Sequence, residues 1–275
     1  PHLPKNGMIQ ITDSLVELAK SQGVHFHFNE KVEKIIVDNK QIKGIKTAEQ
    51  TLDFDYVVSN MDVSFTYERL LNDQFQPTKI LNQEKSSSVI LFHWGINKSF
   101  EQLNVHNMIF SDDDPGEFTD VFDNKKVSND PSFYIYISSK IVPADAPEGC
   151  ENWFVLVNAP IENGQDWDKE IAEKRKYLIS KISKLLGEDI EPLIAAEEKV
   201  DPRDIESRYS GKQGSIYGNA SNNRFAAFYR HPNYSKRIKG LYFAGVSVHP
   251  GGGIPLALNS AKIACECLFD DFKIN

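Results

Sequence analysis

"GLYFAGVSVHPGGGIPLALNSAK", residues 240–262, joins a short apolar strand to a helical pattern through three consecutive glycines. The segment "IKGLYFAG", residues 238–245, has the composition of a short buried strand. Residues 254–269 then place apolar side chains at helical spacing, and Pro255 suits a first helical turn, where a missing N–H costs no hydrogen bond. A strand, a glycine turn and a helix form half of a βαβ crossover, which predicts an α/β fold at this end of the chain.

The glycine run itself allows two interpretations. The dinucleotide fingerprint G-x-G-x-x-G is not met, because Gly251 and Gly253 are followed by Leu256 where the third glycine would stand. One remaining role is close approach of a ligand to backbone N–H groups at the start of the helix. The other is a tight turn that only lets the strand and helix pack together. The glycines alone favour neither.

Composition excludes several classes of protein. The 275 residues are 40% hydrophobic and 25% charged, as expected of a soluble chain with one large or two smaller domains. A net charge of −8 argues against a nucleic-acid surface, which needs clustered Lys and Arg. Three cysteines make no disulfide framework and favour a reduced, cytoplasmic setting. No apolar run reaches the roughly 18 residues that span a bilayer. A start without Met, close to a helix, leads us to expect the C-terminal part of a longer protein.

The first 62 residues predict a helix followed by strands. Apolar residues fall at helical spacing from Met8 up to Gly23, a natural end for an amphipathic helix. Strands are expected at 24–28, 32–38, 41–48 and 51–62. Asn39-Lys40 has acceptable hairpin chemistry. The apolar segment 56–58 is expected to enter a buried sheet.

The middle of the chain has a different sequence pattern, with long strand-like runs at 86–96, 131–140 and 152–160. One strong helix interrupts them and is expected to end at Gly187. Its apolar stripe comprises Trp167, Ile171, Leu178, Ile182 and Leu185. We therefore predict two domains, one of them discontinuous: residues 1–62 and 236–275 form the first, and residues 63–235 form a β-rich insert.

Several polar clusters were weighed as sites. His25 and His27 share one face of an expected strand, but no third metal ligand is apparent, so solvent-facing histidines are expected and no metal site is predicted. The acidic segment 111–120 is interpreted as a solvated loop. His249, beside the glycines, is more typical of a structural histidine than of a general base. The loop 213–235, rich in Gly, Asn and aromatic residues, is either a pocket wall or a surface loop.

Residues 240–264 resemble the C-terminal signature of the bacterial carotenoid desaturases, FAD-dependent oxidoreductases of the phytoene desaturase type. Other segments agree in the expected order: "NGMIQITDSLVELAKSQGVHFHFNEKVEKIIVDNKQIKGIKT", "DYVVSNMDVSFTYERLL", "HNMIFSDD" and "GSIYGNASNNRFAAFYRHPN". The resemblance covers essentially the whole chain. The run His-Pro-Gly-Gly-Gly-Ile-Pro is specific, whereas the opening segment is similar to many flavin oxidases.

The resemblance implies a Rossmann-type FAD-binding domain and a discontinuous mixed-sheet domain that covers the flavin and binds an elongated polyene. It implies that the family's G-x-G-x-x-G segment lies upstream of residue 1. By the same resemblance, the backbone of Val32 faces adenine, and Gly245 and Val246 lie near the ribityl chain and pyrophosphate. Related flavoproteins usually carry an acid where Val246 stands, so only backbone contacts are expected there.

The start of the last helix matches the family's contact with the flavin ring. The residues concerned are Gly252, Gly253, Ile254, Pro255 and Leu256. The N–H groups of Ile254 and Leu256, at the positive end of a helix, suit a site for negative charge, and Pro255 supplies no N–H. At Gly252 a side chain is expected to leave no room for the cofactor.

The implied activity is introduction of C=C bonds into a polyene such as phytoene, a C30 analogue or a hydroxycarotenoid. It requires loss of a hydride and a proton, and side chains offer no two-electron acceptor, so FAD is the expected cofactor. The sequence singles out no catalytic residue. A carotenoid isomerase or oxidase of the same fold and a non-catalytic lipid-binding fragment remain alternatives. A cytoplasmic protein with transient, peripheral membrane contact is expected, and no oligomeric state is predicted.

Overall fold

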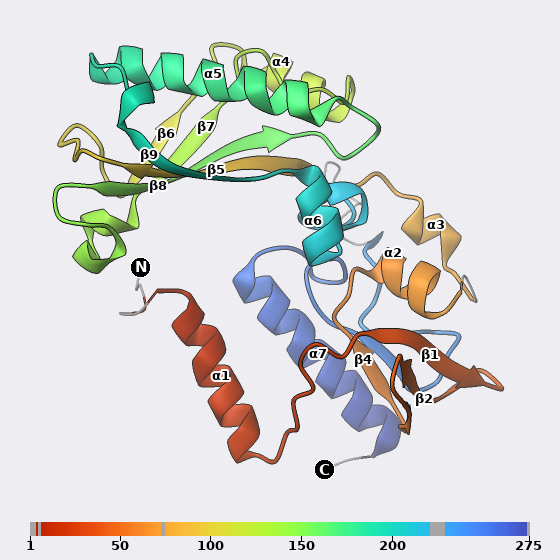
Figure 1. Cartoon of the computed structure of the whole chain (residues 1–275). Helices are drawn as coiled ribbons and strands as arrows, with labels where there is room; N and C mark the ends of the chain where they lie inside the picture. Colours follow the sequence, from red (N-terminus) through yellow and green to blue (C-terminus); the bar gives the residue numbers. More distant parts are fainter. Residues whose placement is uncertain (1–3, 5–6, 73–74, 221–228, 274–275) are drawn as a thin grey trace.

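The computed structural model describes residues 4, 7–72, 75–220 and 229–273. Two sheet-bearing regions are stacked, and both ends of the chain lie in the lower one (Figure 1). The chain carries parallel and antiparallel pairings together with helices, so the predicted α/β class is confirmed. No helix in these described ranges is long and apolar enough to cross a membrane.

The lower region is built around a parallel strand pair from opposite ends of the sequence. Strand β4 (Val57–Ser59) pairs with β10 (Leu241–Phe243), and Leu241 lies opposite Val57. Helix α7 (Ile254–Phe272) packs on β10 through a cluster of Tyr242, Ala264 and Leu268. The predicted strand, glycine turn and helix are therefore confirmed.

A three-stranded antiparallel sheet of β1 (Val32–Asp38), β2 (Gln41–Thr47) and β3 (Thr51–Asp53) lies beside this pair. Asn39 and Lys40 both have positive φ, at 47° and 59°, as a two-residue hairpin turn of type I′ requires. The predicted hairpin is confirmed.

The prediction of one strand over residues 51–62 was wrong. The Phe54 N–H donates to Lys43 O, whereas the Val57 N–H donates to Gly240 O, so the chain changes sheets between these residues. The expected burial of residues 56–58 was also wrong for two of the three: Tyr56 is 41% and Val58 43% exposed. Among the described residues, β4 has only β10 as a partner strand.

The first helix, α1 (Ile9–Ser21), forms as predicted, but the strand expected at residues 24–28 does not. A strand needs a neighbour for its backbone hydrogen bonds, and no strand in the described part of the chain pairs with this segment. Phe26 and Phe28 instead stack on each other at 5.7 Å. The apolar side of α1 is exposed, with Leu15 51% and Leu18 59% accessible.

The upper region is a five-stranded sheet in the order β6-β7-β8-β5-β9, with all four pairings antiparallel. Its strands are β5 (Ser88–Ile96), β6 (His106–Ile109), β7 (Phe133–Tyr136), β8 (Glu151–Ala159) and β9 (Ile194–Val200). The β-runs predicted from the sequence are confirmed in β5, β7 and β8.

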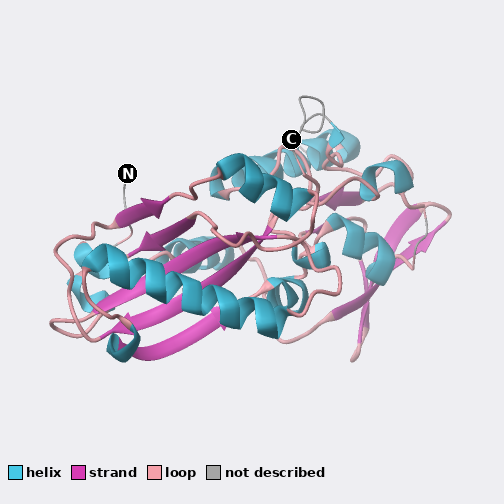
Figure 2. Cartoon of the chain, turned by 90° about the horizontal axis from the view of Figure 1, so that it is seen from above, coloured by secondary structure: helices cyan, strands magenta, loops and turns pink. Residues whose placement is uncertain are grey.

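Helix α5 (Trp167–Leu186) covers one face of this sheet, and from above it lies over the strands (Figure 2). Asp166 caps its start, and Gly187 ends it in the left-handed conformation at φ 72°, as predicted. The stripe predicted to face the core does so except at its last member, because Leu185 is 60% exposed. Phe92, Trp94 and Trp153 are among the sheet residues buried beneath α5.

Short helical elements complete the chain. They are α2 (Val63–Phe65), a π-helical turn (Thr66–Leu70), α3 (Thr78–Leu81), α4 (Asp114–Phe122), α6 (Pro202–Tyr209) and 3-10 turns at Ser138–Lys140, Pro143–Asp145, Glu191–Leu193 and Lys212–Gly214. The prediction of a loop over residues 111–120 was wrong from residue 114 onward, where α4 begins. Asp113 caps α4 by accepting from the Gly116 N–H, and Pro115 occupies its first turn.

Candidate functional site

The carboxyl ends of β4 and β10 lie side by side, as they must in a parallel pair, and the loops that leave them are hydrogen-bonded together. The Asn60 side-chain amide donates to Ala244 O at 3.0 Å, and the Val63 N–H donates to Ser247 Oγ at 3.0 Å. This edge of a parallel sheet is where α/β proteins place ligands. It holds Gly245 and Val246, two of the residues predicted to contact a cofactor.

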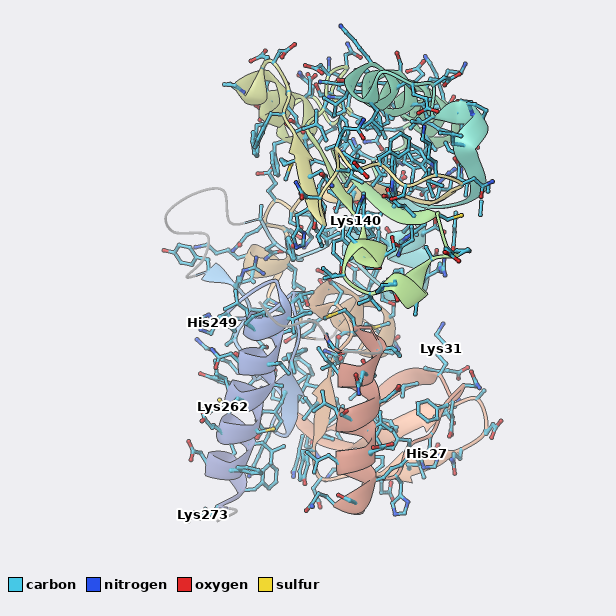
Figure 3. The ribbon with its side chains drawn as sticks, turned by 90° about the vertical axis from the view of Figure 1, so that its left-hand side faces the viewer. His27, Lys31, Lys140, His249, Lys262 and Lys273 are labelled. Atoms are coloured by element: carbon cyan, nitrogen blue, oxygen red, sulfur yellow. The ribbon has the colours of Figure 1, made fainter. Side chains whose placement is uncertain are left out.

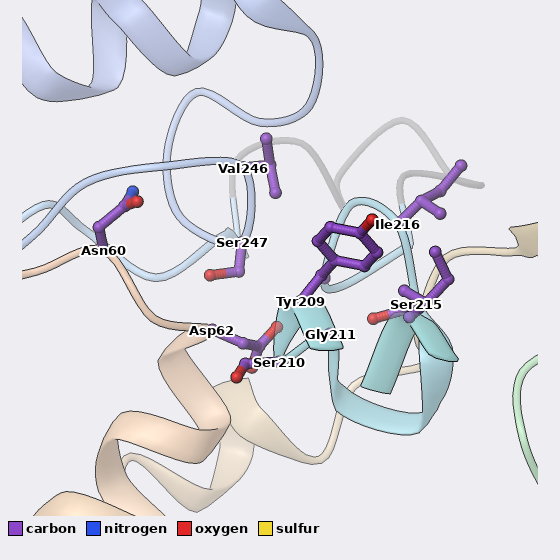
Figure 4. Close-up of a pocket in the computed structure, with 11 residues that line it drawn as sticks. Asn60, Asp62, Tyr209, Ser210, Gly211, Ser215, Ile216, Val246 and Ser247 are labelled. Atoms are coloured by element: carbon purple, nitrogen blue, oxygen red, sulfur yellow. The ribbon is translucent and has the colours of Figure 1, made fainter. Parts of the chain in front are cut away.

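A cavity of about 220 Å³ lies at this edge (Figure 4). Its walls come from residues 60–62, from α6 and the turns after it between 205 and 218, and from Val246 and Ser247. Part of the loop predicted as a pocket wall does line this cavity, through Ser215, Ile216 and Gly218. Residues 221–228 of that loop lie outside the described residues, so the prediction for them stays untested.

A second and more apolar groove of about 460 Å³ lies on the other side of Asn60. Val32, Ile35 and Leu70 line it, together with the chain around β4. Val32, predicted to face adenine, and Val246 therefore open onto two different hollows, and Asn60 borders both. The sequence did not single out Asn60, although an amide directly after a buried strand is a usable signal.

Two charged side chains of opposite sign lie at and behind the wall of the cavity. Asp62 lines it and caps α2 by accepting from the Ser64 N–H at 2.8 Å, and burial raises its pKa. The buried Lys85 ammonium donates to Ser64 Oγ, to Leu81 O and to Asn219 Oδ1, and burial lowers its pKa, which the charge of Asp62 partly offsets. These three hydrogen bonds of Lys85 hold separate segments of the chain together behind the cavity.

A hydrogen-bond network fixes the turn between β10 and α7. The buried Asn233 amide donates to Phe243 O, His249 O and Ser260 Oγ, and Ser260 Oγ also accepts from the Gly245 N–H. The strand end, the turn and the helix are thus held together by two buried side chains. Sequence reasoning missed both.

His231, also missed, is buried against the aromatic core of the lower region. It contacts Pro232 O through Nδ1 at 2.7 Å and the Tyr67 hydroxyl through Nε2 at 3.1 Å. The carbonyl can only accept, so Nδ1 carries the proton and Nε2 accepts from Tyr67. Burial lowers the pKa of His231 to about 4. His249, in contrast, has an exposed side chain near the start of α7 (Figure 3).

The glycines at this turn differ in their backbone conformation and in the space around them. Gly245 has φ 119°, and an added Cβ would lie 2.7 Å from the Asn60 amide nitrogen. At Gly252 an added Cβ would lie 1.9 Å from the Tyr217 ring, so a side chain of this protein fills the space that was predicted to face cofactor. Gly253 has φ 97°, and no atom of the described residues lies within 4 Å of an added Cβ.

Helix α7 begins with N–H groups that no carbonyl within the helix can accept. The first backbone bond at its start runs from the Ala257 N–H to Gly253 O. Ile254 is 57% and Leu256 42% exposed, so the first turn lies at the surface with Pro255 between them. The positive end of a 19-residue helix is therefore open to an anionic or electron-rich group.

No metal centre accompanies these features. Among the described residues, no group of three or more His, Cys, Asp or Glu side chains is placed to hold a metal ion. His27 instead pairs with Glu30, with 3.2 Å between Nδ1 and Oε2.

Comparison with known proteins identifies the family. The flavin containing amine oxidoreductase family matches residues 2–269. The chain belongs to this family. Membership confirms the expected cofactor, FAD.

Curated relatives of this flavin oxidoreductase are carotenoid desaturases, which confirms the resemblance found in the sequence. The chain is 49% identical over 267 residues to a 1-hydroxycarotenoid 3,4-desaturase of a Flavobacterium species, covering 97% of this chain and 55% of that protein. It is 34% identical over 285 residues to a 4,4'-diapophytoene desaturase of Staphylococcus haemolyticus, covering 99% of this chain and 57% of the relative. The chain thus spans about half the length of the curated relatives it matches.

Solved structures agree on the fold of this flavin oxidoreductase. An oxidoreductase from Methanosarcina mazei superposes with a TM-score of 0.62 at 14% identity, covering 96% of this chain and 54% of the other. A putrescine oxidase variant gives a TM-score of 0.60 at 12% identity, covering 98% and 53%. The amine oxidase fold is therefore shared well beyond recognisable sequence similarity.

Proposed function

We propose that this protein is an FAD-dependent carotenoid desaturase that introduces C=C bonds into a polyene. The observation that carries the proposal is 49% identity across 97% of the chain to a 1-hydroxycarotenoid 3,4-desaturase. The diapophytoene desaturases, at 34% identity, act on shorter polyenes by name and support the same reaction class. The substrate is an acyclic carotenoid, either a hydrocarbon or a hydroxylated one.

The residues at the β10–α7 turn fit a flavin. Gly253 has open space where a side chain would stand, and the exposed first turn of α7 offers the N–H groups of Ile254 and Leu256. Gly245 and Val246 would approach the cofactor through backbone, and Val32 borders the groove beyond Asn60. Bound FAD supplies the hydride acceptor that the reaction needs. The contribution of these residues is to hold and orient it.

We assign residues 1–62 and 236–275 to the FAD-binding domain and residues 63–235 to the substrate domain. The antiparallel sheet under α5 supports a separate substrate domain, because its core is distinct from the core around β4 and β10, although Val63, Tyr67 and Leu81 pack into the latter. Polyene substrates dissolve in lipid, so the proposal includes transient contact of a cytoplasmic protein with a membrane surface.

The test is expression from the complete reading frame, followed by absorbance of the purified protein and mass analysis of carotenoid products. We expect bound FAD and products lighter by two hydrogens for each desaturation step. Products of unchanged mass identify an isomerase, and products with added oxygen identify an oxidase. Either result contradicts desaturation, as does polyene binding by a protein that holds no flavin.

A further inference from the structure

The face of the five-stranded sheet opposite α5 carries an ordered row of side chains. Side chains alternate between the two faces along each strand, so the register of neighbouring strands decides which residues line up. From the β6 edge to the β9 edge the row is His106, Tyr136, Phe154, His93 and Glu198. With strands about 4.8 Å apart, the row is roughly 19 Å long.

Aromatic rings follow one another along most of this row. The His106 and Tyr136 rings stack at 5.3 Å, and His93 meets Phe154 edge to face at 5.4 Å. Tyr134, in the neighbouring row, lies 6.5 Å from Phe154 and 6.0 Å from His106. The rings therefore form an unbroken surface from β6 to β5.

The neighbouring row is almost entirely apolar. It consists of Met108, Tyr134, Leu156, Leu91 and Val200. Met108 is 53% exposed, and His106 and His93 are exposed as well. Helix α5 lies on the opposite face of the sheet (Figure 1). An aromatic and aliphatic surface of this extent on a soluble protein marks a binding surface.

A hollow of about 350 Å³ deepens the row where it crosses β5 and β9. It exists because the facing residues there are small: Gly95 on β5 lies opposite Ala196 on β9. An added Cβ on Gly95 would reach within 3.4 Å of the Ala196 Cβ. His93 and Phe154 form one wall, so the aromatic row leads directly into the hollow.

The two ends of the row differ chemically. At the β6 end, His106 Nδ1 lies 2.6 Å from the Tyr134 hydroxyl. The Tyr134 hydroxyl can donate to Nδ1 or accept from it, and in either case Nε2 of His106 is left free to hydrogen-bond a ligand. At the β9 end stands Glu198, an exposed carboxylate 4.0 Å from Arg208. The His106 end therefore offers a ring nitrogen beside aromatic rings, and the Glu198 end offers a charged group.

We propose that this row binds the polyene and that His106, oriented by Tyr134, selects substrates that carry an oxygen at one end. The inference rests on the proposed function and adds to it the residues that choose between a hydroxylated carotenoid and a hydrocarbon. A flat conjugated chain matches the row because it is long, uncharged and able to stack on ring faces. A hydroxyl at its end, which can both donate and accept, meets Nε2 of His106.

The experiment uses the protein from its complete reading frame, loaded with flavin, and two probes: an acyclic carotenoid with one terminal hydroxyl, and the same carotenoid without it. The ratio of their kcat/KM values is measured for wild type, His106→Phe and His106→Gln. The expected ratio falls about 3- to 10-fold in His106→Phe, which lacks a hydrogen-bonding group, and is largely retained in His106→Gln, whose amide can donate or accept. His93→Phe is the matched control, because it removes a histidine from the other part of the same row.

The outcomes separate the two proposals. Wild type that converts neither carotenoid overturns the proposed desaturase function. Wild type that converts them, with a ratio equal in His106→Phe and wild type, overturns the role of His106. If the ratio changes in His93→Phe and not in His106→Phe, the oxygen-bearing end of the substrate lies near His93. That result also overturns the role proposed for His106. Circular dichroism of each variant confirms that only folded protein is compared.

Discussion

Ser260 provides a sharp test of how the β10–α7 turn is held, through replacement of Ser260 by Ala. Its side chain is completely buried in α7 and its Oγ accepts from the Gly245 N–H at 3.1 Å and from the Asn233 amide at 2.8 Å. The substitution removes one oxygen and leaves no room for water in its place. It therefore isolates the contribution of this single acceptor.

The magnitude follows from what each donor does without Oγ. Asn233 still reaches His249 O at 2.9 Å and Phe243 O at 3.2 Å, so its amide remains bonded. The Gly245 N–H is buried and loses its acceptor, which costs about 1–3 kcal/mol. Alanine is a better helix former than serine by about 0.5 kcal/mol. We expect the free energy of unfolding to fall by about 0.5–2.5 kcal/mol.

The chain contains a matched control. Ser88 on β5 is also fully buried, but its Oγ has no hydrogen-bond partner among the described residues. Ser88→Ala removes the same atom from an equally buried site and relieves an unsatisfied hydroxyl. Its effect on stability is expected to be neutral or stabilising by up to about 1 kcal/mol.

Urea unfolding of the complete protein measures both free energies, and absorbance measures flavin bound per protein. Ser260→Ala is expected to lose stability and, because Gly245 is then less firmly held, also flavin content. Ser88→Ala is expected to lose neither. A loss in Ser260→Ala no greater than that in Ser88→Ala would refute the reasoning, since the hydrogen bonds would then contribute nothing.

Three further substitutions test other parts of the structure. Burial lowers the pKa of His231 from 6.5 to about 4, so the unfolded chain binds a proton over that range and the folded one does not. The free energy of unfolding should drop by up to about 3 kcal/mol as pH falls from 6.5 to 4, and pH-dependent urea titrations of His231→Gln should show a flatter profile. Gly252→Val should destabilise the protein because it collides with Tyr217, and the added change Tyr217→Ala should restore melting temperature. Gly95→Val should fill the hollow beside Ala196 and raise KM for the polyene several-fold with little change in melting temperature; an unchanged KM would place the substrate elsewhere.

Elements set by local chemistry could be predicted from the sequence. Helix α5 has its cap at Asp166, its apolar stripe and its terminal Gly187 within one stretch of chain. The turn at Asn39 and Lys40 likewise depends only on residues able to adopt positive φ. In both cases the residues that stabilise the element are close together in the sequence, so the sequence pattern was enough to predict it.

The failures involve partners distant in the sequence. Residues 51–62 read as one strand, but β3 pairs with its neighbour β2 while β4 pairs with β10, about 180 residues later. Residues 24–28 have a strand-like composition and no partner strand among the described residues. β-Propensity describes how well a segment suits a strand, but whether a partner strand lies beside it depends on the whole fold.

The candidate site shows the same limit. Gly245 and Val246 could be predicted as site residues because a recognisable turn follows β10, whereas Asn60 and Ser260 reach that turn from elsewhere in the chain. The aromatic row depends still more on the fold, because it joins side chains from five strands whose order differs from their sequence order. No spacing rule along the chain can show that His106 and Phe154 belong to one surface.

The glycine run therefore has two purposes that the sequence could not separate. Gly252 is required by packing, since the Tyr217 ring occupies the place of its side chain. Gly253 has no such neighbour, and its φ of 97° directs the chain into α7 with open space above the backbone. A substitution at Gly252 thus tests folding first, and Gly253→Ala tests the approach of a ligand to the helix start. Alanine at φ 97° is strained and costs some stability under either interpretation, so flavin bound per folded protein is the deciding quantity. Its loss in Gly253→Ala would support the functional interpretation of this stretch, and its retention would support the structural one.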